Sequence, residues 1–222
     1  RRYLRAKSRA LGHEGALPWH DLFAPLGAES RAWTVEEAKS FVQRHFGGYS
    51  SKLADYAQRS FDERWIDFMP RSGKRDGAFC APIRNDESRI LMNFKPSFGS
   101  VSTLAHELGH GYHNLCLRER TSLQCDTPMT LAETASIFCE TIIKRAALAQ
   151  STGTDRLAIL EASLQGAFQV VVDISSRFIF ERAVFERRRQ RALLPSEFCD
   201  LMRDAQAQTY GDGLAPGSDH RY

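Results

Sequence analysis

The 222-residue sequence lacks the features that mark several specialised classes of protein. Its net charge is only +3 at pH 7, and so small an excess does not favour nucleic acid or a membrane as a partner. No run of 18 apolar residues is present, so we expect no transmembrane helix. The first residues show no secretory signal pattern. The hydrophobic content of 42% and the charged content of 26% are those of a soluble globular protein.

Cysteine is scarce, and its number is odd. No Cys-x-x-Cys pair occurs, which argues against a disulfide framework and against a cysteine-rich zinc site. The absence of such pairs favours a reducing compartment, and we expect a cytoplasmic location. We expect the individual thiols to be small buried hydrophobes. The five residues are Cys80, Cys116, Cys125, Cys139 and Cys199.

The length is sufficient for one large domain with its own core. The sequence predicts a single catalytic domain over residues 1–222. Because the first residue is Arg and not Met, we expect the chain to be a piece of a longer protein. Its oligomeric state cannot be read from the sequence.

The segment from Val101 to Cys116 contains a His-Glu-x-x-His motif. On a helix, residues four apart share one face, so His106 and His110 can hold one metal ion between their imidazoles. Glu107 can then reach a water on the metal and act as its general base. An apolar stripe at helical spacing runs through the same segment, which supports the helix, with Ser100 or Ser102 as its N-cap. The alternative is a buried amphipathic helix with two solvated histidines.

A catalytic zinc ion usually has a third protein ligand. Thr127-Pro128 predicts the start of another helix, and Glu133 lies near that start among small and apolar neighbours. A carboxylate there is costly unless it is paired, and a zinc ion would pair it. Glu140 lies two turns further on the same face, where it could orient a ligand imidazole or form an ordinary salt bridge. His113 shares the face of the two motif histidines, and we prefer a supporting or substrate-contacting role to a ligand role for it.

These segments resemble the oligoendopeptidase F branch of the thimet-type zinc oligopeptidases. The most specific matches are His106-Glu-Leu-Gly-His110-Gly-Tyr-His and Leu131-Ala-Glu133-Thr-Ala-Ser. The resemblance also includes Gly73-Lys-Arg-Asp-Gly77-Ala-Phe-Cys, Ile90-Leu-Met-Asn-Phe, Phe180-Glu and Tyr210-Gly-Asp. It covers essentially the whole chain.

The resemblance implies a mainly α, zincin-like (gluzincin) metallopeptidase fold and a zinc-dependent endopeptidase that hydrolyses short peptides. His106, His110 and Glu133 would hold one zinc ion per chain, and Glu107 would be the catalytic base. Family members continue past this sequence into a segment with a His and several Tyr that bind substrate and stabilise the oxyanion. The chain ends at His220-Arg221-Tyr222, so we do not assign those roles to His220 or Tyr222. The alternative is therefore a zinc-binding but catalytically incomplete fragment, truncated at both ends relative to the family.

The remaining sequence predicts a mostly helical chain with one small β-hairpin. Residues 73–83 and 88–94 read as strands joined by Arg84-Asn-Asp-Glu87, directly before the metal helix. Gly77 would allow a substrate backbone to approach this hairpin and add to it as a strand, although a purely structural hairpin is equally consistent. Helices are expected at about 1–11, 35–46, 50–67, 154–191 and 196–209, the fourth of them buried among others. Residues 17–26 read as an ordered strap anchored by Trp19 and Phe23.

A basic run, Glu186-Arg-Arg-Arg-Gln-Arg191, ends the long helix. It could be a nucleic-acid patch, but cations at a helix C-terminus are favoured by the macrodipole, and we prefer that explanation. The expected partners are therefore short peptides, without nucleic acid or membrane.

Overall fold

The computed structural model describes residues 1–27, 31–84 and 86–215. Asn85 in the predicted hairpin link and the predicted loop residues 216–222, including His220 and Tyr222, lie outside the described residues. The chain divides into two compact units, Glu29–Ile159 and the combination of Arg1–Ala28 with Leu160–Tyr222. Each unit is described by itself, and the expectation of one catalytic domain over 1–222 stays a prediction.

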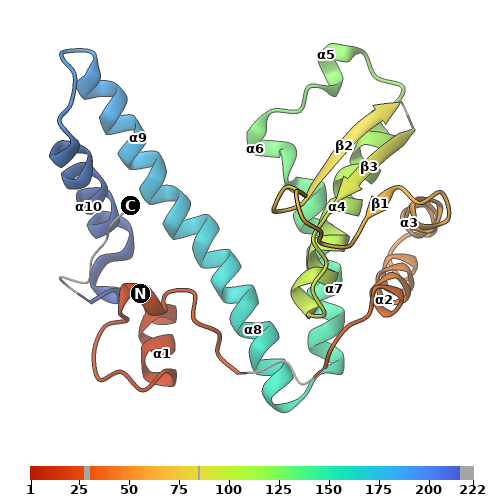
Figure 1. The fold of residues 1–222 in the computed structure, drawn as a ribbon, viewed down its shortest axis with the longest axis horizontal. Coiled ribbons are helices and arrows are strands. Elements are labelled where there is room, and N and C mark those ends of the chain that lie inside the picture. Colours follow the sequence, from red (N-terminus) through yellow and green to blue (C-terminus); the bar gives the residue numbers. More distant parts are fainter. Residues whose placement is uncertain (28–30, 85, 216–222) are drawn as a thin grey trace. The chain divides into compact units, whose positions relative to one another are not determined.

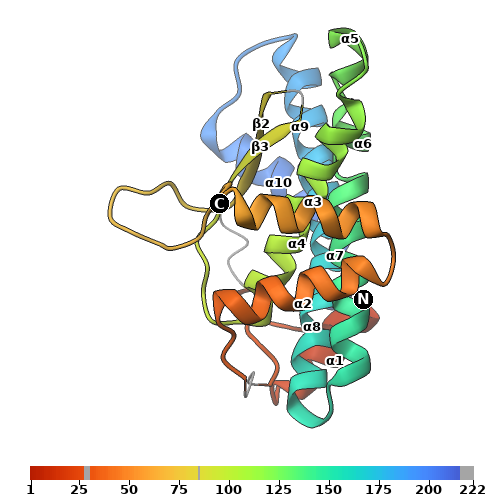
Figure 2. The same cartoon turned by 90° about the vertical axis from the view of Figure 1, so that its right-hand side faces the viewer.

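The first unit, Glu29–Ile159, contains a small sheet and a set of helices, as Figures 1 and 2 show. Its elements are α2 (Val35–Gly47), α3 (Ser51–Asp62), β1 (Ile66–Asp67), β2 (Phe79–Arg84), β3 (Glu87–Leu91), α4 (Phe98–Leu117), α5 (Ser122–Cys125), α6 (Met129–Ala132), α7 (Thr134–Gln150) and the start of α8 (Gly153–Phe168). The described part of the chain is thus mainly α with a small sheet before α4, as the sequence predicts.

The second unit combines the two ends of the chain, and all of its named elements in the described residues are helices or short helical turns. Its elements are α1 (Arg2–Ala10), the 3₁₀ turn η1 (Trp19–Asp21), the rest of α8, the π-helical segment η2 (Gln169–Asp173), α9 (Ile174–Arg188), α10 (Pro195–Tyr210) and the 3₁₀ turn η3 (Gly211–Gly213). The helix predicted at 154–191 is therefore interrupted by one π-helical segment.

The sheet has the order β1-β3-β2. The antiparallel pairing of β2 with β3 confirms the predicted hairpin, although β2 begins only at Phe79. The prediction that a helix continues to residue 67 is wrong: α3 ends at Asp62, and Arg64 has a φ of 55°. Ile66 then pairs in parallel with Ile90, so this short strand depends on a partner 24 residues away.

Helix α4 is the centre of the core of its unit. Val101, Leu104, Ala105 and Leu108 are all 0% exposed, which confirms the predicted apolar stripe. The helix begins one turn before the predicted caps, with Ser97 at the N-cap. Ser100 lies within the first turn, where its hydroxyl accepts a hydrogen bond from the Lys95 N–H. The capping box predicted for α2 is present, because Thr34 and Glu37 exchange hydrogen bonds.

The strap at residues 17–26 is ordered, and one of its two predicted anchors is wrong. Phe23 is 48% exposed. Trp19 is partly buried and packs on Tyr210 at a ring-centroid distance of 6.0 Å, beside Leu17 and Leu22, which are 0% and 1% exposed. Leu17 also forms a parallel bridge with Leu214. The cysteine prediction is also wrong for three thiols, since Cys116, Cys125 and Cys199 are exposed.

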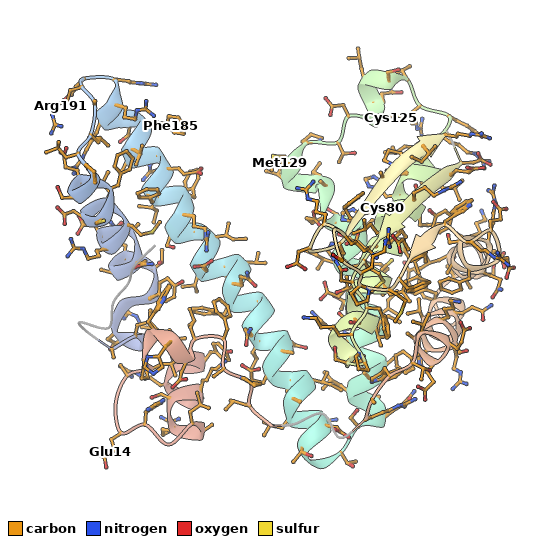
Figure 3. The ribbon with its side chains drawn as sticks, in the orientation of Figure 1. Glu14, Cys80, Cys125, Met129, Phe185 and Arg191 are labelled. Atoms are coloured by element: carbon orange, nitrogen blue, oxygen red, sulfur yellow. The ribbon has the colours of Figure 1, made fainter. Side chains whose placement is uncertain are left out.

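The prediction of a long helix buried among others fails for its middle and end. Val171, Phe178 and Phe185 are 69%, 60% and 67% exposed, and Figure 3 shows the Phe185 side chain on α9. The continuous helical stretch Gly153–Arg188 is long and apolar enough to cross a membrane by length and composition. Core helices of soluble proteins can have the same length and composition, and the expectation of no membrane partner stays a prediction.

A buried ion pair joins α1 to α8 in the second unit. Lys7 Nζ lies 2.8 Å from Glu161 Oε1, and the two residues are 1% and 7% exposed. Tyr3 donates its hydroxyl proton to the same carboxylate oxygen at 2.7 Å. Burial is the largest cause that raises the pKa of Tyr3. The hydrogen bond to Glu161 and the negative charge of Glu161 raise it as well. Tyr3 and Lys7, one turn apart on the same face of α1, therefore both contact one oxygen of this carboxylate.

Removing only one member of this pair should strongly destabilise the unit, because the other charge stays buried without its partner. We predict that Lys7→Met lowers the free energy of unfolding by about 3–5 kcal/mol, measured by urea denaturation. The double variant Lys7→Met/Glu161→Leu should recover most of that loss, since no charge is then buried. A double variant as unstable as the single one would contradict this interpretation.

Candidate metal centre

The site depends on the close approach of two helices at a glycine. A Cβ atom on Gly109 of α4 would lie 2.8 Å from the carbonyl oxygen of Ala135 and 2.8 Å from Cα of Ser136. It would also lie 3.1 Å from Cβ of Cys139 on α7. Backbone atoms cannot move aside cheaply, so only glycine allows α7 to pack this closely on α4. The approach brings the start of α7 beside the histidines of α4.

Glu133 lies between α6 and α7, at the N-cap position of α7. The sequence predicts a single helix here, but the chain breaks it at Glu133, whose φ of −89° and ψ of 1° are not helical. The buried Ser136 hydroxyl lies 2.7 Å from Glu133 Oε2 and 3.0 Å from the Glu133 carbonyl oxygen. The break and this contact turn the carboxylate towards α4.

The structure brings His106, His110 and Glu133 together. Glu133 Oε2 lies 3.1 Å from Nε2 of His106 and 3.2 Å from Nε2 of His110. The candidate ligand atoms of all three residues lie within 4.8 Å of one another. In a tetrahedral zinc site with bonds of about 2.0–2.2 Å, donor atoms are roughly 3.3 Å apart. The two nitrogens and the oxygen therefore have the identity and spacing that one such ion requires.

Glu107 is buried next to this group, with 5% of its surface exposed. Among the described residues, its Oε2 atom has no hydrogen-bond partner. Burial is the main cause that raises the pKa of Glu107 to about 7; the charge of His106 opposes the rise and the charge of Glu133 adds to it. A buried carboxylate oxygen without a protein partner is free to bind a water or a substrate group in the site.

Glu140 approaches His106 from the side opposite Glu133. Its Oε2 lies 3.4 Å from Nδ1 of His106, while Nε2 of the same ring faces Glu133. Oε1 of Glu140 accepts a hydrogen bond from Ser102 at 3.1 Å and forms an ion pair with Lys144. Glu140 thus makes both contacts that the sequence left as alternatives, an imidazole contact and a salt bridge.

The charges of the site affect the two imidazoles differently. Burial lowers the pKa of His106, but the hydrogen bond of Glu140 and the charges of three glutamates outweigh it, so the net pKa is raised. Burial lowers the pKa of His110, and Glu133 opposes this only in part. Burial raises the pKa of Glu140, but the bonds from His106 and Lys144 prevail and lower it to about 2. Glu140 is therefore anionic beside the His106 ring.

His113 does not join the group of His106, His110 and Glu133. It lies one turn beyond His110 and lines an apolar pocket together with residues of α3 and α7. The arrangement agrees with the preference for a supporting or substrate-contacting role, which stays a prediction.

The segment around Gly77 is held by hydrogen bonds that the sequence does not reveal. Asn93 donates to the carbonyl oxygens of Arg75 and Gly77 at 3.0 and 3.2 Å. The Lys74 ammonium, whose side chain is 1% exposed, donates to the carbonyl oxygens of Asp67, Met69 and Met92. Gly77 has a φ of 85°, and a Cβ there would meet no atom of the described residues within 4 Å. The segment leading into β2 is therefore fixed while its surface stays open.

Sequence reasoning missed Ser102 and Ser136, which contact the carboxylates of Glu140 and Glu133. Their positions give a signal in retrospect, because each serine lies one turn from a site residue on its own helix. Serine is common enough in helices that spacing alone would not have distinguished these two.

A mainly α fold in which one helix carries His-Glu-x-x-His and a second supplies a glutamate defines the zincin-like class. The comparison with known families agrees, and the chain belongs to peptidase family M3, whose model matches residues 48–222. This match includes both helices of the site and the hairpin before them.

Relatives extend the comparison to almost the whole chain. The group B oligopeptidase PepB of Streptococcus agalactiae is 28% identical over 95% of this chain and 35% of its own length. The chromosomal oligoendopeptidase F of Lactococcus lactis subsp. cremoris is 29% identical over 86% of this chain and 32% of its own. The chain thus spans about a third of the length of these relatives.

Solved structures support the fold alone, because their sequence identities are low. PZ peptidase A, solved with an inhibitor, superimposes with a TM-score of 0.80 at 17% identity, over 98% of this chain and 39% of its own. A solved chain from Chlamydophila abortus has a TM-score of 0.76 at 23% identity, over 97% and 37%. Both structural matches therefore include residues of both compact units.

We predict that Gly109→Ala weakens metal binding by displacing α7 from α4. The added methyl group meets backbone atoms at 2.8 Å, and relieving that overlap moves Glu133 away from the two imidazoles. The free energy of unfolding should fall by about 1–3 kcal/mol, and the dissociation constant for Zn²⁺, measured by competition with a chromogenic chelator, should rise at least tenfold.

Gly166→Ala is the matched control, since Gly166 lies within α8 and a Cβ there meets no atom within 4 Å in the part of the chain that the structure describes. It should leave Zn²⁺ affinity unchanged and raise stability by about 0.5–1 kcal/mol. Equal Zn²⁺ affinity in the Gly109→Ala and Gly166→Ala variants would refute the proposed dependence of the site on this helix contact.

Proposed function

We propose that this chain carries the metal centre of a zinc-dependent endopeptidase that hydrolyses oligopeptides. The observation that carries the proposal is the position of Glu133 Oε2, 3.1 and 3.2 Å from the imidazoles of His106 and His110, with Glu107 buried beside them. Membership of peptidase family M3 supports the reaction class. The names of the relatives, oligopeptidase and oligoendopeptidase F, support peptides as substrates.

In this proposal His106, His110 and Glu133 hold one zinc ion per chain. When bound, zinc polarises a peptide carbonyl and makes water more acidic. Glu107 takes the proton of the attacking water and delivers it to the nitrogen of the leaving amine. Its burial and its unpartnered oxygen are consistent with that task. Glu140 orients the His106 ring through the nitrogen that does not face Glu133.

We propose that the backbone of the substrate peptide binds along the free edge of strand β2. This strand lies at the edge of the sheet, with β3 on one side and no strand of the described residues on the other. A peptide can add to such an edge through main-chain hydrogen bonds. The open surface at Gly77 permits a close approach at the start of this edge. Strand addition would hold an extended peptide without selecting its side chains.

The alternative function is a zinc-binding piece that lacks groups needed for turnover. It is motivated by the span of this chain, which is about a third of its relatives. Loss of a single oxyanion donor can reduce kcat by 10²–10³. A chelator-sensitive peptide assay on this chain beside a full-length relative distinguishes the two, because the incomplete piece would bind zinc without comparable hydrolysis. A reducing, cytoplasmic location and the absence of a nucleic-acid partner remain part of the proposal.

Glu107→Gln should abolish hydrolysis while leaving zinc bound, because glutamine keeps the shape of the side chain but cannot accept the proton. We expect kcat/KM for a quenched fluorescent peptide to fall by about 10²–10⁴. Zinc content, measured by elemental analysis, should stay at the wild-type value.

The matched control is Glu119→Gln, which makes the same chemical change at an exposed position after α4. Its kcat/KM should equal that of the wild type. If Glu107→Gln also hydrolyses the peptide at the wild-type rate, the general-base assignment is wrong.

A further inference from the structure

We propose that an apolar pocket beside the metal centre binds one large uncharged apolar side chain of the peptide, aromatic or aliphatic, and so determines specificity. The proposal rests on the proposed function and adds the class of side chain that the site selects. The pocket has a volume of about 780 Å³ and is formed by α3, α4, α6 and α7. Ligand pockets in proteins typically measure about 300–1,000 Å³, so the space is sufficient for a bulky side chain.

The lining of the pocket selects against charge. Among the described residues, no Asp, Glu, Lys or Arg side chain lines it. Leu53 and Leu131 contribute aliphatic surface, and Tyr49 stacks edge to face on Phe138 at a centroid distance of 5.0 Å. A charged group placed here would lose part of its hydration without an Asp, Glu, Lys or Arg partner in this lining, whereas an apolar group would be favoured.

The pocket is lined by residues that adjoin the metal centre on both α4 and α7. His113 lines it and follows His110 by three residues, a rise of about 4.5 Å on a helix. Thr134 also lines it and directly follows Glu133. Consecutive Cα atoms of a peptide are about 3.8 Å apart, so a peptide with its scissile carbonyl at the metal centre has a neighbouring side chain within reach of the pocket.

Several apolar walls of the pocket are open to the outside. Leu131, Phe138 and Tyr49 are 57%, 45% and 63% exposed. Apolar groups gathered around a hollow mark a binding groove more often than scattered surface residues do. The position of this hollow next to the metal ligands identifies the peptide as its occupant.

The test uses two variants in the pocket and one matched control. Phe138→Ala removes the aromatic wall, and Ser50→Trp fills the space from the N-cap of α3. Ile137→Ala is the control, because Ile137 is also 45% exposed and lies next to Phe138 on α7 but does not line the pocket. Glu107→Gln is added to each variant, so that binding is measured without turnover.

The probes are fluorescein-labelled hexapeptides that differ only at one central residue, which is Phe, Ala or Asp. Their dissociation constants are measured by fluorescence anisotropy in the presence of Zn²⁺. With an intact pocket, the Phe peptide should bind at least about tenfold more tightly than the Ala peptide, and the Asp peptide should bind most weakly. Phe138→Ala should reduce the Phe/Ala ratio to below about threefold, Ser50→Trp should abolish or reverse it, and Ile137→Ala should leave it unchanged.

Equal binding of the Phe and Ala peptides with an intact pocket, or no binding of either, would overturn the proposal. So would an equal loss of preference in Ile137→Ala and Phe138→Ala. Turnover by the chain with Glu107 intact is measured separately. A Phe preference in binding without hydrolysis would refute the proposed function but support the apolar pocket. Hydrolysis without any preference would support the proposed function but refute the pocket.

Discussion

The contact between α4 and α7 at Gly109 is the constraint on which the site depends. The absence of a side chain at this position lets the backbone of Ala135 and Ser136 pass close to α4. That approach places Glu133, at the start of α7, opposite two histidines that lie one turn apart on α4. The buried apolar stripe of α4 supplies the stability that holds this geometry, since four of its residues have no exposed surface.

The electrostatics of the site follow from the same packing. Glu133, Glu107 and Glu140 surround His106, and each has a different environment. Glu140 is held anionic by His106 and Lys144, whereas burial without a protein partner for one oxygen raises the pKa of Glu107 to about 7. Residues on two elements thus give three similar carboxyl groups three different tasks in the proposed mechanism: holding the metal, moving a proton and orienting a ring.

Much of the site could be predicted from the sequence because its signals are local. The spacing of His106 and His110, the apolar stripe of α4 and the hairpin before it all depend on neighbours within a few residues. The errors arose where distant contacts decide the structure. Ile66 becomes a strand because it pairs with Ile90, and the helix break at Glu133 accompanies the packing of α7 on α4. The apolar residues of α9 read as buried, yet Phe178 and Phe185 are exposed, because composition does not say what covers a face.

The most direct test of the account is the zinc content of the purified chain and of its Glu133→Ala variant, measured by elemental analysis with folding checked by circular dichroism. The account predicts about one zinc ion per wild-type chain and a clear loss in the variant, because Glu133 Oε2 is the only donor in the group of three that comes from outside α4. A folded wild-type chain without zinc, or a Glu133→Ala variant that retains zinc like the wild type, would contradict it.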